Sequence, residues 1–197
     1  MDRATFMNKY WRYYLLLEKK FTDTLNYVEL AEENFSTYSV EYAHQLLAIG
    51  SELDTFFKVY CGFNLNDRKY ITDYMRHIMC EYPEITTQGV GIYNTEITLT
   101  PYEKWINWNS RSGNLLSWWK AYNDVKHNRQ EKITEASMEN VVTALAALHL
   151  IEMKYLQVIT KETGEPDELE SSSNLFSLTD WAFNFGLVDY LWTKAGS

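Results

Sequence analysis

The stretch SVEYAHQLLAIGSELDTFFKVYCG, residues 39–62, decides the fold that we expect for this chain. Large apolar residues recur along it at alternating spacings of four and three, which places them on one face of a helix. These residues are Tyr42, Leu46, Ile49, Leu53, Phe56 and Tyr60. Ser39 is a candidate N-cap, and Gly62 is a natural stop after the last apolar residue. Such a stripe predicts a helix that packs antiparallel against a second helix.

Similar periodicity predicts further helices on both sides of this stretch. We expect them over residues 6–30, 67–82, 114–129 and 134–161. Residues 84–104 instead contain isolated apolar residues among threonines and glycines, which favours an irregular insertion or a short hairpin. The predicted fold class is therefore all-α, an up-and-down helical bundle with this one insertion.

The composition divides the chain into three parts: a helical bundle over residues 1–161, an acidic linker over 162–174, and a C-terminal appendage over 175–197. Residues 162–170 hold five acidic residues and no basic one, and three serines follow, which is typical of a solvated linker. Beyond the linker, Trp181, Phe185, Val188 and Trp192 return to helical spacing. We therefore expect an aromatic C-terminal helix that the bundle or a protein partner covers.

Composition also excludes several classes of protein. The chain has 197 residues, of which 46% are hydrophobic, enough for one globular domain with a substantial core. No run of 18 apolar residues and no secretory signal segment is evident, so we expect no membrane span and a cytoplasmic location. Two cysteines make neither a disulfide framework nor a zinc motif, and we expect no metal or cofactor. The net charge of −9 argues against tight nonspecific binding of duplex DNA.

The stretch SWWKAYNDVKHNR, residues 117–129, is the strongest candidate for function. Residues 120–132 contain four Lys or Arg and two acidic residues, which reverses the sign of the whole chain. Cations bind phosphate, and an imidazole between them can exchange protons near neutral pH. On a helix, Asn123 and His127 are neighbours four residues apart, and Tyr122 and Lys126 form the adjacent row.

This spacing predicts a site for RNA or a nucleotide phosphate. The candidate catalytic residues are His127, for proton transfer, and Asn123, to orient the imidazole or a phosphate oxygen. The candidate phosphate- or RNA-binding residues are Lys120, Tyr122, Lys126 and Arg129. A simpler interpretation stays open: cations at the C-terminal end of a helix favour its dipole without any further role.

Longer motifs give a resemblance to a known family. The octapeptide YNDVKHNR, the preceding Trp pair, the helix ENVVTALAALHLIE, and YVELAEENFSTYSVEY followed by LLAIGSELDTFFK resemble the HEPN superfamily over most of residues 10–160. The resemblance implies a helical bundle that forms a homodimer and binds RNA. It also implies a metal-independent endoribonuclease of toxin–antitoxin or antiphage defence, with an antitoxin or other protein partner.

The HEPN signature is Arg-polar-x-x-x-His, and this chain departs from it at one position. Asn123 matches the polar residue and His127 the histidine, but Tyr122 stands in place of the arginine. Lys126 and Arg129 lie about 100° and 200° from His127 around a helix, so neither takes over the arginine's place within one chain. The alternative that a cation of the second protomer of a dimer replaces the arginine stays open. The alternative function is a catalytically inactive helical module that binds a protein partner.

Other candidates carry less weight. Glu52 and Asp54 could face the edge that carries His127, or lie on a solvated face. His77 and Cys80 have the spacing of a metal pair, but no second pair accompanies them. His149 is expected to be a core or boundary histidine of its helix.

Overall fold

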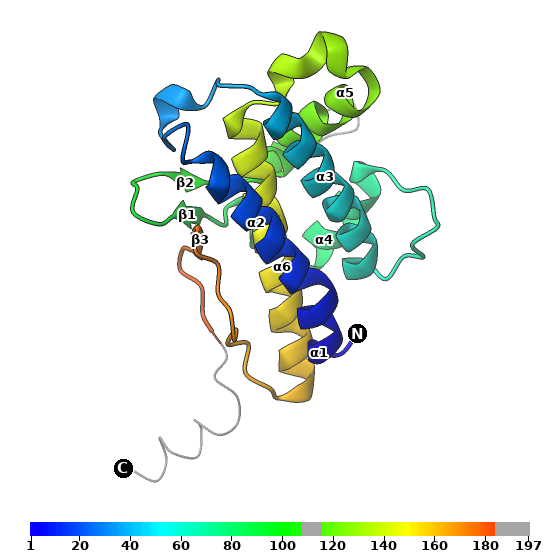
Figure 1. Ribbon diagram of the computed structural model, residues 1–197. Helices are drawn as coiled ribbons and strands as arrows, with labels where there is room; N and C mark the ends of the chain where they lie inside the picture. Colours follow the sequence, from blue (N-terminus) through cyan, green and yellow to red (C-terminus); the bar gives the residue numbers. More distant parts are fainter. Residues whose placement is uncertain (108–115, 184–197) are drawn as a thin grey trace.

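The computed structural model describes residues 1–107 and 116–183, and it is mostly helical with a small sheet at one side (Figure 1). The α-helices are α1 (Arg3–Phe6), α2 (Arg12–Thr24), α3 (Val40–Tyr60), α4 (Ile71–Glu81), α5 (Ser117–Lys132) and α6 (Met138–Thr163). A π-helical turn, Met7–Trp11, joins α1 to α2. Short 3₁₀ turns lie at Glu32–Asn34, Pro83–Thr86, Glu103–Asn107 and Ile133–Glu135.

The sheet contains three short antiparallel strands, β1 (Val90–Ile92), β2 (Thr98–Leu99) and β3 (Phe176–Leu178). Their order is β2-β1-β3. Val90 of the central strand pairs with Leu99 on one side and with Leu178 on the other. The hairpin expected within residues 84–104 is therefore confirmed, and a strand from the C-terminal region extends it.

The stripe on α3 is confirmed as a core face. Leu46, Ile49, Leu53 and Phe56 are completely buried, and α6 packs along them through the middle of the bundle (Figure 1). The hydroxyl of Ser39 accepts a hydrogen bond of 2.9 Å from the backbone N–H of Tyr42, as expected of an N-cap. The predicted helical fold is thus confirmed in its coarse form, a mostly helical protein, and the three-stranded sheet corrects the all-α class.

In the described part of the chain, α6 is the one helix long and apolar enough to cross a membrane by length and composition. Most of this apolar stretch is buried inside the protein, against the other helices. Its length and composition therefore suit the central helix of a bundle equally well.

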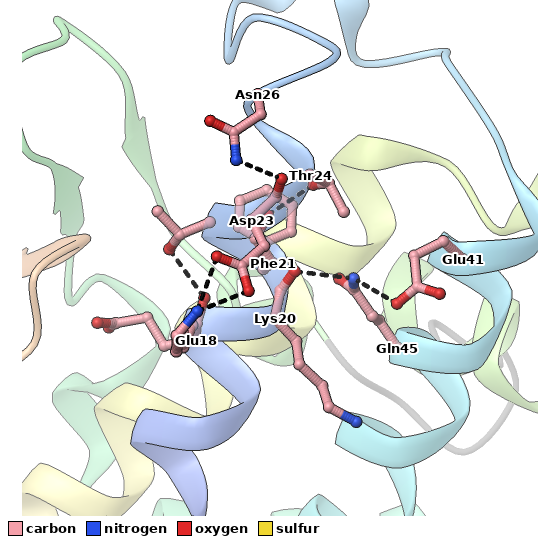
Figure 2. A network of polar contacts seen from close by, with 10 residues as sticks. Glu18, Lys20, Phe21, Asp23, Thr24, Asn26, Glu41 and Gln45 are labelled. Atoms are coloured by element: carbon pink, nitrogen blue, oxygen red, sulfur yellow. Dashed lines mark hydrogen bonds and ion pairs between the residues drawn. The ribbon is translucent and has the colours of Figure 1, made fainter.

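The first long helix ends earlier than its periodicity predicted, at Thr24 instead of near residue 30. Side chains at its end bond to the helix's own carbonyls: Thr24 donates to the Phe21 carbonyl at 2.6 Å, and Asn26 to the Asp23 carbonyl at 2.9 Å (Figure 2). Polar side chains of this kind compete with helical bonding and favour a stop.

A buried glutamine joins the end of α2 to α3. Nε2 of Gln45 donates to the Lys20 carbonyl and to the Glu41 carboxylate, both at 3.1 Å (Figure 2). Because the glutamine is only 3% exposed, these bonds stabilise the crossing of the two helices.

The C-terminal region differs most from expectation. We call residues 164–178 the strap, because they return from the end of α6 to the sheet (Figure 1). Most residues of the expected linker, 162–174, are exposed, but Asp167 and Ser173 within it and Leu175 after it are buried against the bundle. Residues 176–178, expected to open an aromatic helix, form β3 because β1 offers them a pairing edge. Residues 179–183, which include Trp181 of the expected helix, are not helical, and residues 184–197 lie outside the described residues.

Candidate functional site

Aromatic packing fixes the position of α5 in the bundle. Trp118 is buried, and its Nε1 donates to the Pro101 carbonyl at 2.9 Å. The Trp119 ring lies 6.1 Å from that of Phe57 on α3 and 5.4 Å from that of Tyr122. With these rings buried, the opposite polar edge of α5 is left at the surface, beside the C-terminal half of α3.

A cavity of about 340 Å³ lies along this edge, and we call it the α3–α5 cavity. It is bounded by α3, by the loop that precedes α4, and by α5. Its lining residues are Asp54, Lys58, Asp67, Arg68, Lys69, Tyr70, Trp119, Tyr122, Asn123, Lys126 and His127. The structure thus brings together four of the six residues that the sequence proposed for the site.

The cavity carries more positive than negative charge. Lys58, Arg68, Lys69 and Lys126 face two carboxylates, Asp54 and Asp67. Lys58 pairs with Asp54 at 3.0 Å, and Lys69 approaches Asp67 at 3.7 Å. In the described part of the chain, Arg68 and Lys126 take part in none of the ion pairs found. Two cations are therefore left to attract an anion, although the chain as a whole is acidic.

Tyr122, the residue that departs from the HEPN signature in the proposed resemblance, packs in the core of the protein. It is only 4% exposed, and its ring lies directly over Gly50 of α3. Its hydroxyl accepts a hydrogen bond of 3.1 Å from Nζ of Lys126, and that nitrogen lies 5.1 Å from the ring centroid. Tyr122 therefore brings no cation but holds the lysine of the next helical turn in the cavity.

Asn123 and His127 both line the cavity, but they are not joined to each other. Nδ2 of Asn123 donates to the carbonyl of Trp119 at 2.8 Å, one turn back along α5. The His127 side chain is exposed, and no hydrogen bond to it is found among the described residues. Asn123 is therefore not bonded to the imidazole in this arrangement, and its other expected role, orienting a phosphate oxygen, stays a prediction.

Lys120 and Arg129 do not line the cavity. Lys120 lies 2.5 Å from Asp124, and this hydrogen-bonded ion pair raises the pKa of the lysine and lowers that of the aspartate. Asn128 interrupts the helix with φ −148° and ψ 64°, and Arg129 follows it on the exposed side. Arg129, proposed to bind phosphate, therefore lies outside the α3–α5 cavity.

Sequence reasoning missed the loop residues of the site. Arg68, Lys69 and Tyr70 lie in the loop before α4, because the helix predicted from residue 67 begins only at Ile71. The only signal was the cluster NDRKY at residues 66–70. Of the two acidic residues proposed for α3, Asp54 lines the cavity, where it also accepts a hydrogen bond of 2.9 Å from Tyr74.

Glu52 lies away from the α3–α5 cavity. It is partly buried, which raises its pKa, and its charge raises the pKa of Tyr10 and of Glu152. Across residues 1–107 and 116–183, no group of three or more His, Cys, Asp or Glu is placed to hold a metal ion. His77 contacts Glu81 at 3.3 Å instead of forming a pair with Cys80.

Comparisons with protein-family models, with curated protein sequences and with solved structures give no significant match. The chemistry of the α3–α5 cavity and the sequence motifs of α5 are therefore the two supports for a function. Both point to the same four residues: Tyr122, Asn123, Lys126 and His127.

Proposed function

We propose that this protein binds single-stranded RNA in the α3–α5 cavity through its phosphate groups. The observation that carries the proposal is the convergence of Lys58, Arg68, Lys69 and Lys126 from three separate segments of the chain. Cations gathered in one hollow concentrate an anionic ligand even when the net charge of the protein is negative.

An exposed aromatic ring favours a single strand over a duplex. Tyr70 lines the cavity, is 60% exposed, and has the guanidinium carbon of Arg68 at 5.7 Å from its ring centroid. Unpaired bases stack on such rings while neighbouring cations bind the phosphates. A nucleotide is the smallest ligand that offers both groups.

We propose further that the chain is a HEPN-like protein of toxin–antitoxin or defence type, acting as a homodimer. Its reaction is cleavage of RNA by attack of a 2′-hydroxyl on the adjacent phosphorus, with departure of the 5′-oxygen. The proton of the 2′-hydroxyl passes to His127 and from it to the departing 5′-oxygen, while Lys126 and Arg68 stabilise the charge on the phosphate. No metal takes part in these roles.

A second candidate function is a catalytically inactive module that binds a protein partner. The observation that favours it is Tyr122, which is buried against Gly50 and supplies no cation where the HEPN signature has one. In this alternative, the cations of the cavity contact acidic groups of the partner protein.

RNA binding is tested by fluorescence anisotropy with a labelled mixed-sequence RNA of about 20 nucleotides, in EDTA and over a range of salt concentrations. The variant Arg68→Gln/Lys69→Gln is expected to bind more weakly, and its salt slope falls by about 0.7 for each lost phosphate contact. Lys19→Gln/Lys20→Gln is the matched control, because it removes two cations from the exposed side of α2. Equal loss in both variants would reject the cavity as the binding site.

Cleavage is tested separately on a denaturing gel, with the same RNA and with His127→Ala. Products that form in EDTA with the wild-type protein and disappear with the variant support the nuclease. Binding without any cleavage retains RNA as the ligand and rejects catalysis. If no RNA binds at any salt concentration, RNA is rejected as the ligand and the protein-binding module is the remaining candidate function.

A further inference from the structure

A second cavity, of about 300 Å³, lies between α6 and the strap, and we call it the strap cavity. It shares no lining residue with the α3–α5 cavity. Met153, Leu169, Phe176 and Leu178 give it a largely apolar wall, and His149 of α6 supplies an imidazole. Apolar pockets with a few placed polar groups are the usual form of a small-molecule site.

The strap is held in place by the first two helices. The carboxylate of Glu18 accepts hydrogen bonds from the backbone N–H of Asn174, at 2.8 Å, and from the hydroxyls of Ser173 and Tyr14. Nε1 of Trp11 donates to the Ser171 carbonyl at 2.7 Å. Because these contacts are buried or partly buried, the wall that the strap forms belongs to the folded protein.

His149 is the distinctive group of this cavity. It is only 4% exposed, and the rings of Trp11, Tyr14 and Phe176 lie between 5.3 and 5.7 Å from it. Its Nδ1 has no hydrogen-bond partner among the described residues. That nitrogen is closed to solvent, so a ligand in the strap cavity can reach only the part of the imidazole ring that lines the cavity.

The charge around the cavity limits what can bind. Glu168, on the exposed rim, is the one charged residue among the described residues that line it. Burial lowers the pKa of His149 to about 3, so its ring is neutral at physiological pH. A neutral imidazole and a carboxylate give no attraction to an anion, and an apolar wall disfavours any buried charge.

We propose that the strap cavity binds a small uncharged molecule with a flat ring and one N–H or O–H group, which hydrogen-bonds to His149. An apolar cavity of about 150 Å³ accepts benzene, so the strap cavity has room for a fused two-ring molecule. The aromatic side chains around the imidazole favour a ring over an aliphatic chain.

The test uses indole as the probe and indole-3-carboxylate as its anionic counterpart. Long-range ¹H–¹⁵N spectra of the full chain resolve the imidazoles of its four histidines, and His149→Gln assigns the signal of His149. Indole is expected to shift the His149 signal in a saturable way, with the carboxylate binding at least tenfold more weakly. No shift with indole, or equal binding of the two probes, would overturn the proposal.

Two variants fill the cavity from different walls. Met153→Trp does so from α6, and Ser172→Trp does so from the exposed strap should the first fail to fold. Each is expected to reduce indole binding at least tenfold. Val158→Trp, at an exposed position of α6, is the control for a bulky substitution. If a variant with a filled cavity folds and still binds indole as tightly as the wild-type protein, the ligand binds elsewhere and the proposal is wrong.

Discussion

The ring of Tyr122 lies directly over the backbone of Gly50, where a Cβ atom would meet Cδ2 of the tyrosine at 2.3 Å. Gly50 lies within the helix α3, so its backbone conformation does not require glycine. Glycine is needed here because the tyrosine ring occupies the space that a side chain would take. The two residues couple the position of α5 to that of α3. The hydroxyl of the same tyrosine accepts a hydrogen bond from Lys126, so core packing and the α3–α5 cavity share one side chain.

Gly50→Ala is expected to destabilise the protein by about 1–3 kcal/mol, because the new methyl group overpacks the contact with Tyr122. Urea denaturation followed by circular dichroism measures the change. In the Tyr122→Ala background the same substitution should cost much less, since the ring is gone. An equal cost in both backgrounds would show that the loss does not come from this contact.

Tyr70→Ala is expected to weaken binding of single-stranded RNA by about 1–3 kcal/mol, the usual contribution of one stacked base. The backbone N–H of Tyr70 keeps its bond to Asp73 at the start of α4, so the loop itself should persist. Anisotropy with labelled RNA gives the affinity. Tyr27→Ala is the control, since that ring is 89% exposed and lies outside the cavity.

The proposed homodimer predicts a particle of twice the 23.3 kDa of one chain in light scattering after size exclusion. If two copies of α5 meet, His127→Cys should form a disulfide-linked dimer in a Cys80→Ser background, which removes the exposed native thiol. Lys20→Cys, on α2, is the control for random crosslinking. A monomeric mass at micromolar concentration, with no crosslink, would reject the composite site.

Glu152 is completely buried, and neither carboxylate oxygen has a hydrogen-bond partner among the described residues. Burial, with a smaller effect of Glu52, raises its pKa well above 4.5. The folded state therefore keeps this proton after the unfolded state has lost it, and stability falls as pH rises above 4.5.

Glu152→Met is therefore expected to stabilise the protein, by about 1–3 kcal/mol at pH 8 and by less at pH 5. Urea denaturation at the two pH values measures the difference. Glu139→Met, at an exposed position of α6, is the control for replacing a glutamate by methionine on the same helix. If the stabilisation by Glu152→Met were smaller at pH 8 than at pH 5, the raised pKa of Glu152 could not be its cause.

Burial of His149 is expected to make stability change with pH in the opposite direction at acid pH. Its pKa is lowered by burial from 6.5 to about 3, so between these values the unfolded state binds the extra proton. Stability is then lost as pH falls through this window, by about 1.4 kcal/mol per pH unit for one group. His149→Gln should flatten the slope between pH 6 and 4 by about that amount. A parallel slope in the two proteins would show that the imidazole is not shielded from water.

The helical part of the fold could be predicted where local spacing and burial agree. Leu46, Ile49 and Leu53 repeat with the period of a helix and lie in the core, so the sequence pattern and the structure coincide there. The start of the same helix was also predictable, because an N-cap such as Ser39 acts on a backbone N–H only three residues away. Ends controlled by several weak side-chain bonds, such as that of α2, were predicted less well.

The candidate site divides in the same way. Tyr122, Asn123, Lys126 and His127 were predicted together because helical geometry places residues four apart on one edge. Arg68, Lys69 and Tyr70 could not be predicted, since a loop has no period and its approach to α5 depends on how α3 and α4 pack. Arg129 does not line the cavity; it follows Asn128, which leaves the helical conformation.

By itself, the sequence determined a helical bundle, its central apolar stripe, and a cationic edge with a histidine on one helix. These features depend on contacts between near neighbours in the chain. Only the tertiary structure decided that residues 176–178 form a strand, because the pairing edge of β1 lies far away in the sequence. It alone also brought the loop cations to α5 and closed the strap over His149, since both depend on which distant segments can bury their apolar surfaces together.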